Sequence, residues 1–123
     1  MLKLNSFLLS SAQPKKLVAF YRQVLGHAPN WEEGEYSGFE NDGCFTLVIG
    51  PHSKVHRQNS NPERIIFNFE TADVKGDFER VKQLDDAKVV AEPYKMEDNQ
   101  DFWIATFSDP DGNYFQLVSP MKG

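Results

Sequence analysis

Two ten-residue segments of the chain share most of their sequence pattern, although they lie far apart. Residues 42–51 read DGCFTLVIGP and residues 111–120 read DGNYFQLVSP, and the two align without a gap. Both contain Asp-Gly, an aromatic residue, an aliphatic pair and a final proline. A repeat of this kind predicts two copies of one supersecondary unit, each too small to bury a stable core alone.

The same order of elements surrounds each copy. In the first half, alternation and spacing predict a strand over residues 2–9, closed by Ser10 and Ser11, either of which could cap the next helix. That helix opens at Pro14 and stops at Gly26. The following strands are expected at residues 28–32, 35–41 and 45–49, with a turn at Asp42-Gly43 before the last. The second half repeats the order. A strand is expected at 64–70, then a helix that begins at Asp73 and has Leu84 on its apolar face, then strands at 88–94, 102–107 and 114–119.

The predicted fold class is therefore α+β, with two βαβββ modules that form a curved mixed sheet. We expect a single domain over residues 1–123, made of module one at 1–50, a hydrophilic linker at 51–63 and module two at 64–123. A length of 123 residues leaves no room for a separate second domain.

The charge and the cysteine content limit the partners and the cellular compartment that can be expected. The net charge is −5, divided as +1 over residues 1–61 and −6 over residues 62–123, and no basic stripe is present. Nucleic acid and anionic membrane surfaces are therefore not expected as partners. The single cysteine, Cys44, cannot form an intramolecular disulfide, and no segment approaches the roughly 20 apolar residues of a membrane span. A cytoplasmic protein is expected.

Two motifs resemble a known family. FYRQVLG at residues 20–26 and FSDPDGNYFQLV at residues 107–118 are similar to motifs of the vicinal oxygen chelate superfamily, which includes glyoxalase I, bleomycin-resistance proteins and extradiol dioxygenases. The resemblance implies that two half-barrel modules form a cleft and that the chain forms a homodimer. In metal-dependent members, four side chains from the first and last strand of each module hold a divalent ion that acts as a Lewis acid.

Carried over to this chain, those four positions are poor in metal ligands. They fall on Ser6, Leu47, Ile66 and Gln116, and a shift of one residue would replace Leu47 by Val48. A divalent ion needs three or four N, O or S donors, whereas this set offers one amide oxygen and one hydroxyl. We therefore predict no metal and no cofactor at these positions, and no catalytic residue is identified.

Six residues are predicted to bind a ligand. Three could form hydrogen bonds from strand positions, and three aromatic residues among polar neighbours could form a cleft wall that stacks a flat molecule. They are Ser6, Asn68 and Gln116, and Trp31, Tyr36 and Trp103. The acidic run of Glu32, Glu33 and Glu35 beside Trp31 favours a cationic or amine-bearing ligand. The expected ligand is therefore a small organic molecule that is aromatic or cationic. The segment from Asp109 to Asn113 is interpreted as a type I turn that aims Gln116.

The sequence thus predicts metal-independent binding of a small organic molecule in an aromatic cleft at a homodimer interface, similar to the bleomycin-resistance branch. Two alternatives stay open at this point. One is a metal-dependent lyase or dioxygenase of the glyoxalase family with ligands not yet identified. The other is a regulatory or interaction module whose cleft is vestigial.

Overall fold

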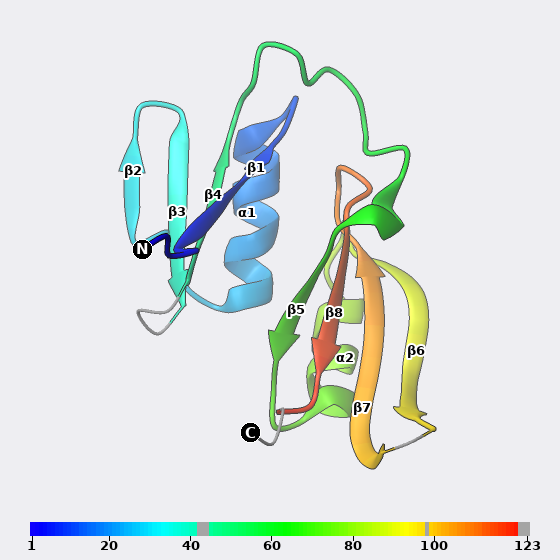
Figure 1. Cartoon of the computed structure of the whole chain (residues 1–123). Coiled ribbons are helices and arrows are strands. Elements are labelled where there is room, and N and C mark those ends of the chain that lie inside the picture. Colours follow the sequence, from blue (N-terminus) through cyan, green and yellow to red (C-terminus); the bar gives the residue numbers. More distant parts are fainter. Residues whose placement is uncertain (42–44, 98, 121–123) are drawn as a thin grey trace. The chain divides into compact units, whose positions relative to one another are not determined.

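The computed structural model describes residues 1–41, 45–97 and 99–120, and its chain divides into two compact units. The first unit is Met1–Gln58 and the second is Asn59–Gly123 (Figure 1). Each unit contains its own sheet, so each is described by itself. Within the described residues, no helix is long and apolar enough to cross a membrane.

The first unit contains one helix and a four-stranded sheet. Strand β1 pairs in parallel with β4, whereas β4 with β3 and β3 with β2 are antiparallel pairs, which gives the strand order β1-β4-β3-β2. The elements are β1 (Ser6–Ser10), α1 (Pro14–Leu25), β2 (Trp31–Glu33), β3 (Tyr36–Asn41) and β4 (Phe45–Gly50).

The second unit repeats this arrangement. Its strand order is β5-β8-β7-β6, again with one parallel pair between the first and last strands of the unit. The elements are a short 3-10 helix η1 (Pro62–Arg64), β5 (Ile66–Glu70), α2 (Val74–Lys82), β6 (Lys88–Met96), β7 (Asn99–Ser108) and β8 (Tyr114–Val118). Two βαβββ modules and an α+β fold class are thereby confirmed.

The two helices begin differently. For α1, Ser10 and Ser11 were predicted as caps, but the N-cap residue is Gln13, which makes no capping hydrogen bond through its side chain. The Ser11 hydroxyl instead accepts a hydrogen bond from the Gln13 backbone N–H at 2.9 Å and so shapes the turn before the helix. In α2 the Asp73 carboxylate accepts from the Gly76 backbone N–H at 3.0 Å, which is a true N-cap.

Helix ends and strand bounds also differ in detail from the prediction. Helix α1 ends at the predicted Gly26, whose φ of 81° suits glycine and whose N–H donates to the Arg22 carbonyl at 2.9 Å. Helix α2 ends at Lys82, so Leu84 lies beyond it. Strand β1 begins at Ser6, the partner of Thr46, whereas Leu2 is exposed and precedes the paired residues.

The other shifts are small. Strand β2 begins at Trp31 and ends at Glu33, later than the predicted 28–32, and β5 starts at Ile66 rather than at residue 64. The turn predicted at Asp42-Gly43 lies outside the described residues.

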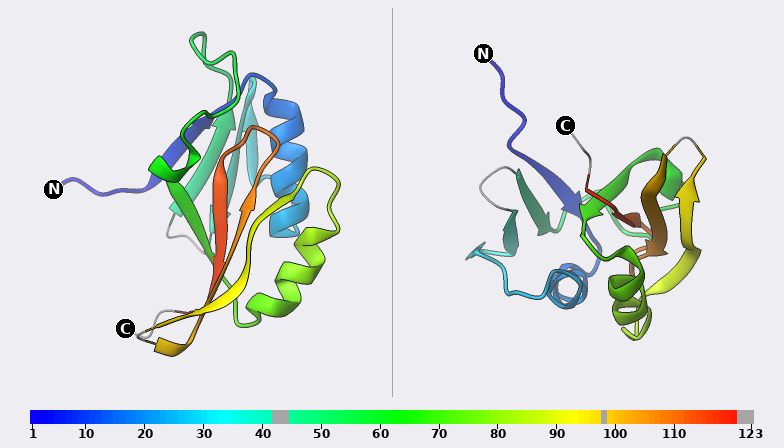
Figure 2. Two further views of the ribbon diagram at one scale, coloured as in Figure 1. Left: turned by 90° about the vertical axis from the view of Figure 1, so that its right-hand side faces the viewer. Right: turned by 90° about the horizontal axis from the view of Figure 1, so that it is seen from below.

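One face of each sheet carries the core. In the second unit, the rings of Phe78 on α2 and Phe107 on β7 lie 5.2 Å apart, and Phe107 stacks on Phe115 at 5.6 Å. Helix α2 therefore covers the face to which Phe107 and Phe115 point, and Figure 2 shows it lying along that sheet. In the first unit, buried Phe39, Leu47 and Ile49 form the corresponding face.

Residues that the repeat aligns with one another do not lie on the same face of their sheets. Leu47 is 3% exposed and its register partners are Phe7 and buried Phe39, so it belongs to the core. Gln116, which the gapless alignment equates with Leu47, lies on the opposite side of its sheet from Phe115 and Leu117. The assignment of Leu47 as the counterpart of Gln116 is therefore wrong, because one residue of shift moves a strand residue to the other face. Val48 is on the non-core face.

Candidate functional site

Two aromatic residues lie on the non-core face of the first sheet. Trp31 on β2 is the register partner of Gly38 on β3. Ser37 on β3 pairs with Ile49 on β4, so the residues next to them, Tyr36 and Gly50, also lie side by side. A Cβ added at Gly38 would overlap the Trp31 ring, and one added at Gly50 would overlap the Tyr36 ring. Each ring therefore lies flat against the backbone of the next strand, a close approach that only glycine permits.

We call Trp31 and Tyr36 together the aromatic platform. The two residues are 36% and 39% exposed, respectively, which is high for residues with this much apolar surface. The Tyr36 hydroxyl donates to the Pro51 carbonyl at 3.0 Å, which holds the ring in place. The platform therefore offers two ordered aromatic surfaces to a ligand.

Two acidic side chains lie on the same sheet face as the platform. Glu33 is the register partner of Tyr36, and Glu40 is two positions from Gly38, so both share the platform's side of the sheet. The four strands of this sheet contain three glutamates and no Lys, Arg or His. Because an aromatic face and carboxylates both attract positive charge, this surface is suited to a cation.

Ser6 occupies the end of the same face. It pairs with Thr46 across the parallel β1 and β4 strands, and its hydroxyl donates to the Asn5 side-chain oxygen at 2.9 Å. Three of the six predicted ligand residues, Ser6, Trp31 and Tyr36, thus share one sheet face.

A polar row crosses three strands on the non-core face of the second sheet. Asn68 on β5 pairs with Gln116 on β8, and Gln116 pairs with Thr106 on β7. The Gln116 Nε2 donates to Thr106 Oγ1 at 3.1 Å, which orients the amide. We call Asn68, Gln116 and Thr106 the amide row. Sequence reasoning missed Thr106, although its place opposite Gln116 follows from the hairpin turn.

That turn has the predicted form. The Gly112 N–H donates to the Asp109 carbonyl at 3.0 Å, which closes the four-residue turn, and Gly112 has a φ of 82°. The buried Asp109 carboxylate accepts from the backbone N–H groups of Asp111 at 2.8 Å and Asn113 at 3.0 Å. These bonds fix the start of β8 and hence the register that places Gln116 opposite Thr106.

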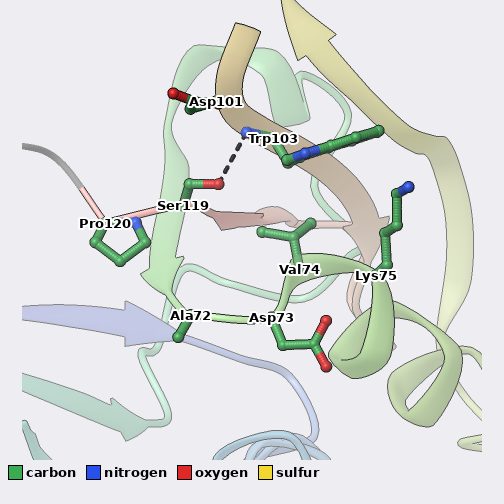
Figure 3. A pocket seen from close by; sticks show the side chains of 8 residues that line it. All are labelled: Ala72, Asp73, Val74, Lys75, Asp101, Trp103, Ser119 and Pro120. Atoms are coloured by element: carbon green, nitrogen blue, oxygen red, sulfur yellow. Dashed lines mark hydrogen bonds between the residues drawn. The ribbon is translucent and has the colours of Figure 1, made fainter.

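Trp103 lies on the other face of its sheet. Thr106 and Ile104 pair with Gln116 and Val118, so the odd-numbered residues of β7, including Trp103, point to the side of α2. There Trp103 borders a cavity of about 350 Å³ beside the start of α2 (Figure 3). The six predicted residues therefore lie on one face of the first sheet and on both faces of the second. Counting alternate residues back from the 109–113 turn would have revealed this.

The four positions that the family resemblance assigns to a metal do not fit one. Leu47 is in the core, Val48 and Ile66 are apolar, and only the Ser6 hydroxyl and the Gln116 amide oxygen are donors. Within the described residues, no three His, Cys, Asp or Glu side chains are grouped so that they could hold a metal ion. The donor chemistry of these residues is unlike that of a site for a divalent ion.

Two βαβββ modules in one chain, each with a helix on one face of its sheet, define the fold class. The family model of the Glyoxalase/Bleomycin resistance protein/Dioxygenase superfamily matches residues 3–117, and the chain belongs to this superfamily. No curated protein matches the chain.

Solved structures of the superfamily have the same fold. A glyoxalase/bleomycin resistance protein/dioxygenase family enzyme from Burkholderia phytofirmans has a TM-score of 0.77 at 16% identity, over 98% of this chain and 100% of that one. A glyoxalase-related enzyme from Fulvimarina pelagi has a TM-score of 0.76 at 14% identity, with 98% and 89% covered. A superfamily member from Sphaerobacter thermophilus has a TM-score of 0.71 at 19% identity, with 98% of each chain covered.

Proposed function

We propose that this protein binds a small organic molecule without the help of a metal ion, and that the aromatic platform binds a flat, cationic part of that molecule. The observation that carries the proposal is the close packing of the Trp31 and Tyr36 rings on Gly38 and Gly50, while both residues stay more than a third exposed. Ordered and exposed aromatic rings lose little entropy when a flat ligand stacks on them.

Charge selects the ligand class. Glu33 and Glu40 share the face of the platform, and no basic side chain lies in the four strands. A ligand cation over an aromatic face gains about 0.5–1 kcal/mol at an exposed site. The carboxylates add a long-range attraction that depends on ionic strength. A planar aromatic cation combines both contributions, whereas an anion of the same shape would be repelled.

The first experiment uses Trp31 as its own reporter. In a Trp103→Phe variant Trp31 is the only tryptophan, and its fluorescence is titrated with N-methylquinolinium and, separately, with 1-naphthoate as an anion of similar shape. We expect saturable quenching by the cation and none by the anion, with weaker binding at high salt. Equal binding of the two ions would contradict the proposal.

Neighbouring glutamates supply a matched pair of variants. Glu33 faces the platform, whereas Glu32, the partner of Ser37, points to the other side of the same strand. We expect Glu33→Gln to raise the dissociation constant of N-methylquinolinium about fivefold, in line with a partly screened charge interaction. Glu32→Gln should leave it unchanged. An equal effect of both changes would indicate nonspecific attraction to an acidic surface.

The amide row is proposed to supply hydrogen bonds to the polar groups of a natural ligand. Asn68 is exposed, and Gln116 is oriented by Thr106. For a ligand found by thermal-shift screening, Gln116→Ala and Asn68→Ala should each weaken binding by about 1–2 kcal/mol. A fall in melting temperature of the free protein, with unchanged affinity, would show that the row is structural.

Metal independence is tested by elemental analysis. The protein is incubated with zinc, nickel, manganese and ferrous iron and then gel-filtered, and the metal content per chain is measured. We expect a ratio near zero, because the superfamily positions offer only one amide oxygen and one hydroxyl. A ratio near one would favour the metal-dependent lyase or dioxygenase function.

We also propose that the chain forms a homodimer. Apolar side chains at the start of the chain and on the edge strand β1 are exposed, namely Leu2, Leu4 and Leu8 at 101%, 77% and 49%. Covering such residues is a common source of association energy. Sedimentation equilibrium should give twice the 14.1 kDa chain mass, and a monomer at all concentrations would contradict this proposal.

A further inference from the structure

The cavity beside the start of α2 lies on the opposite side of the second sheet from the amide row. Its apolar lining includes the Trp103 ring and Val74, and Ser119 contributes a hydroxyl (Figure 3). The backbone of Trp103 is anchored in both directions, because its backbone N–H donates to Ser119 Oγ at 2.9 Å and its carbonyl accepts from the Ser119 backbone N–H at 3.1 Å. The strand that carries the indole is therefore fixed beside the cavity. The full lining is Ala72, Asp73, Val74, Lys75, Asp101, Trp103, Ser119 and Pro120.

Two lysine side chains converge on this indole. Lys75, in the first turn of α2, places its Nζ 4.1 Å from the ring centroid. Lys95, the register partner of Trp103 on β6, places its Nζ 5.4 Å from the same centroid. Two like charges brought to one ring repel each other, and the ring only partly offsets this cost.

Among the described residues, no carboxylate oxygen lies within 4.0 Å of the Nζ of Lys75 or of Lys95. Lys82 on the same helix provides a contrast, since its Nζ lies 5.8 Å from the centroid of the Phe78 ring instead. Lys75 lines the cavity, and Lys95 reaches the Trp103 ring from the neighbouring strand.

We propose that this cavity is a second ligand site, which binds a small organic carboxylate. Lys75 and Lys95 would bind the carboxylate group, and the apolar body would lie against Trp103 and Val74. A volume of about 350 Å³ is at the lower end of the range for small-molecule sites. The site shares no residue with the aromatic platform or the amide row, and the proposal does not depend on the function proposed for those surfaces.

Two acidic residues also line the cavity, and each already has a partner within the protein. The Asp73 carboxylate accepts the capping hydrogen bond from Gly76 and faces the positive end of α2. Asp101 has a partner of its own. Lysine side chains are flexible, so the ammonium groups of Lys75 and Lys95 can both reach the carboxylate of one ligand.

The test follows the indole N–H signals in ¹H–¹⁵N NMR spectra. The chain has two tryptophans, so a Trp31→Phe variant assigns the Trp103 signal. The probes are 3-phenylpropionate, its neutral analogue 3-phenylpropanamide and its cationic analogue 3-phenylpropylammonium. We expect saturable shifts of the Trp103 signal with the carboxylate, and at least about tenfold weaker binding of the two analogues, since one charged contact is worth about 1.4 kcal/mol or more.

Lysine variants localise the charge effect. Lys75→Gln and Lys95→Gln should each weaken binding of 3-phenylpropionate about tenfold, whereas Lys82→Gln should leave it unchanged. The same spectra show whether each variant is folded. Comparable binding of all three probes, an equal effect of Lys82→Gln, a shift of Trp31 instead of Trp103, or no saturable shift up to the solubility limit of the carboxylate would each overturn the proposal.

Discussion

The two units of this chain share their strand order but not the placement of their exposed aromatic residues. In the first unit Trp31 lies on the non-core face of the sheet, over a glycine and beside Glu33. In the second unit Trp103 lies on the helix side and is approached by two lysines. The same topology thus places one tryptophan beside glutamates and brings two lysine ammonium groups to the other. A fold of this kind fixes the path of the backbone, whereas the chemistry of each face depends on strand alternation and a few glycines.

The largest contrast between the units concerns stability. Phe107→Ala removes a fully buried ring that packs between Phe78 and Phe115 and should lower the free energy of unfolding by about 3–5 kcal/mol. Trp31→Ala removes a larger side chain that is 36% exposed and lies outside the core, so we expect a loss of about 1 kcal/mol. Urea denaturation of both variants measures the difference. Equal losses would mean that the platform is part of the core.

The next largest expected effect comes from replacing Gly38, against which the Trp31 ring packs. Gly38→Val places a side chain where the Trp31 ring lies, so the exposed ring must move away from the sheet. We expect about tenfold weaker binding of N-methylquinolinium, with a stability loss of about 1–2 kcal/mol. The control is Thr46→Val, which introduces the same side chain on the same face but opposite Glu40. Normal binding by Gly38→Val would show that the platform does not stack the cation.

Most of the fold could be predicted because periodicity and turn residues agree along the whole chain. The spacing of Leu17, Phe20, Tyr21 and Val24 defined α1, and all four are buried. The Asp109-Pro110-Asp111-Gly112 sequence defined the turn before β8. These signals are local, and local signals are what a single sequence reveals reliably.

The candidate site was predicted only as a set of residue types. The repeat equated Leu47 with Gln116, but strand faces alternate with each residue, and an error of one position exchanged a core residue for an outward-facing one. Trp103 was grouped with Trp31 for its polar neighbours, although those neighbours do not report which face a side chain occupies. The role of Gly38 and Gly50 could not be seen either, because it depends on rings from an adjacent strand.

The smallest expected effects are on stability and concern the N-cap residues of the two helices. Gln13 and Asp73 have similar backbone angles, with φ of −139° and −136° and ψ of 63° and 79°, yet only Asp73 accepts a capping hydrogen bond through its side chain. Asp73→Ala should lower the free energy of unfolding by about 1 kcal/mol, and Asp73→Asn, which can still accept the bond, by much less.

The converse change should stabilise the first helix. In Gln13→Asp, the new carboxylate would accept from the Lys16 backbone N–H as Asp73 accepts from that of Gly76, and it would also face the positive end of α1. We expect a gain of about 0.5 kcal/mol in the free energy of unfolding, measured by urea denaturation beside Gln13→Asn. No gain from either variant would mean that the Ser11 hydroxyl, which already accepts from the residue 13 N–H, supplies all the stabilisation that this helix start can gain.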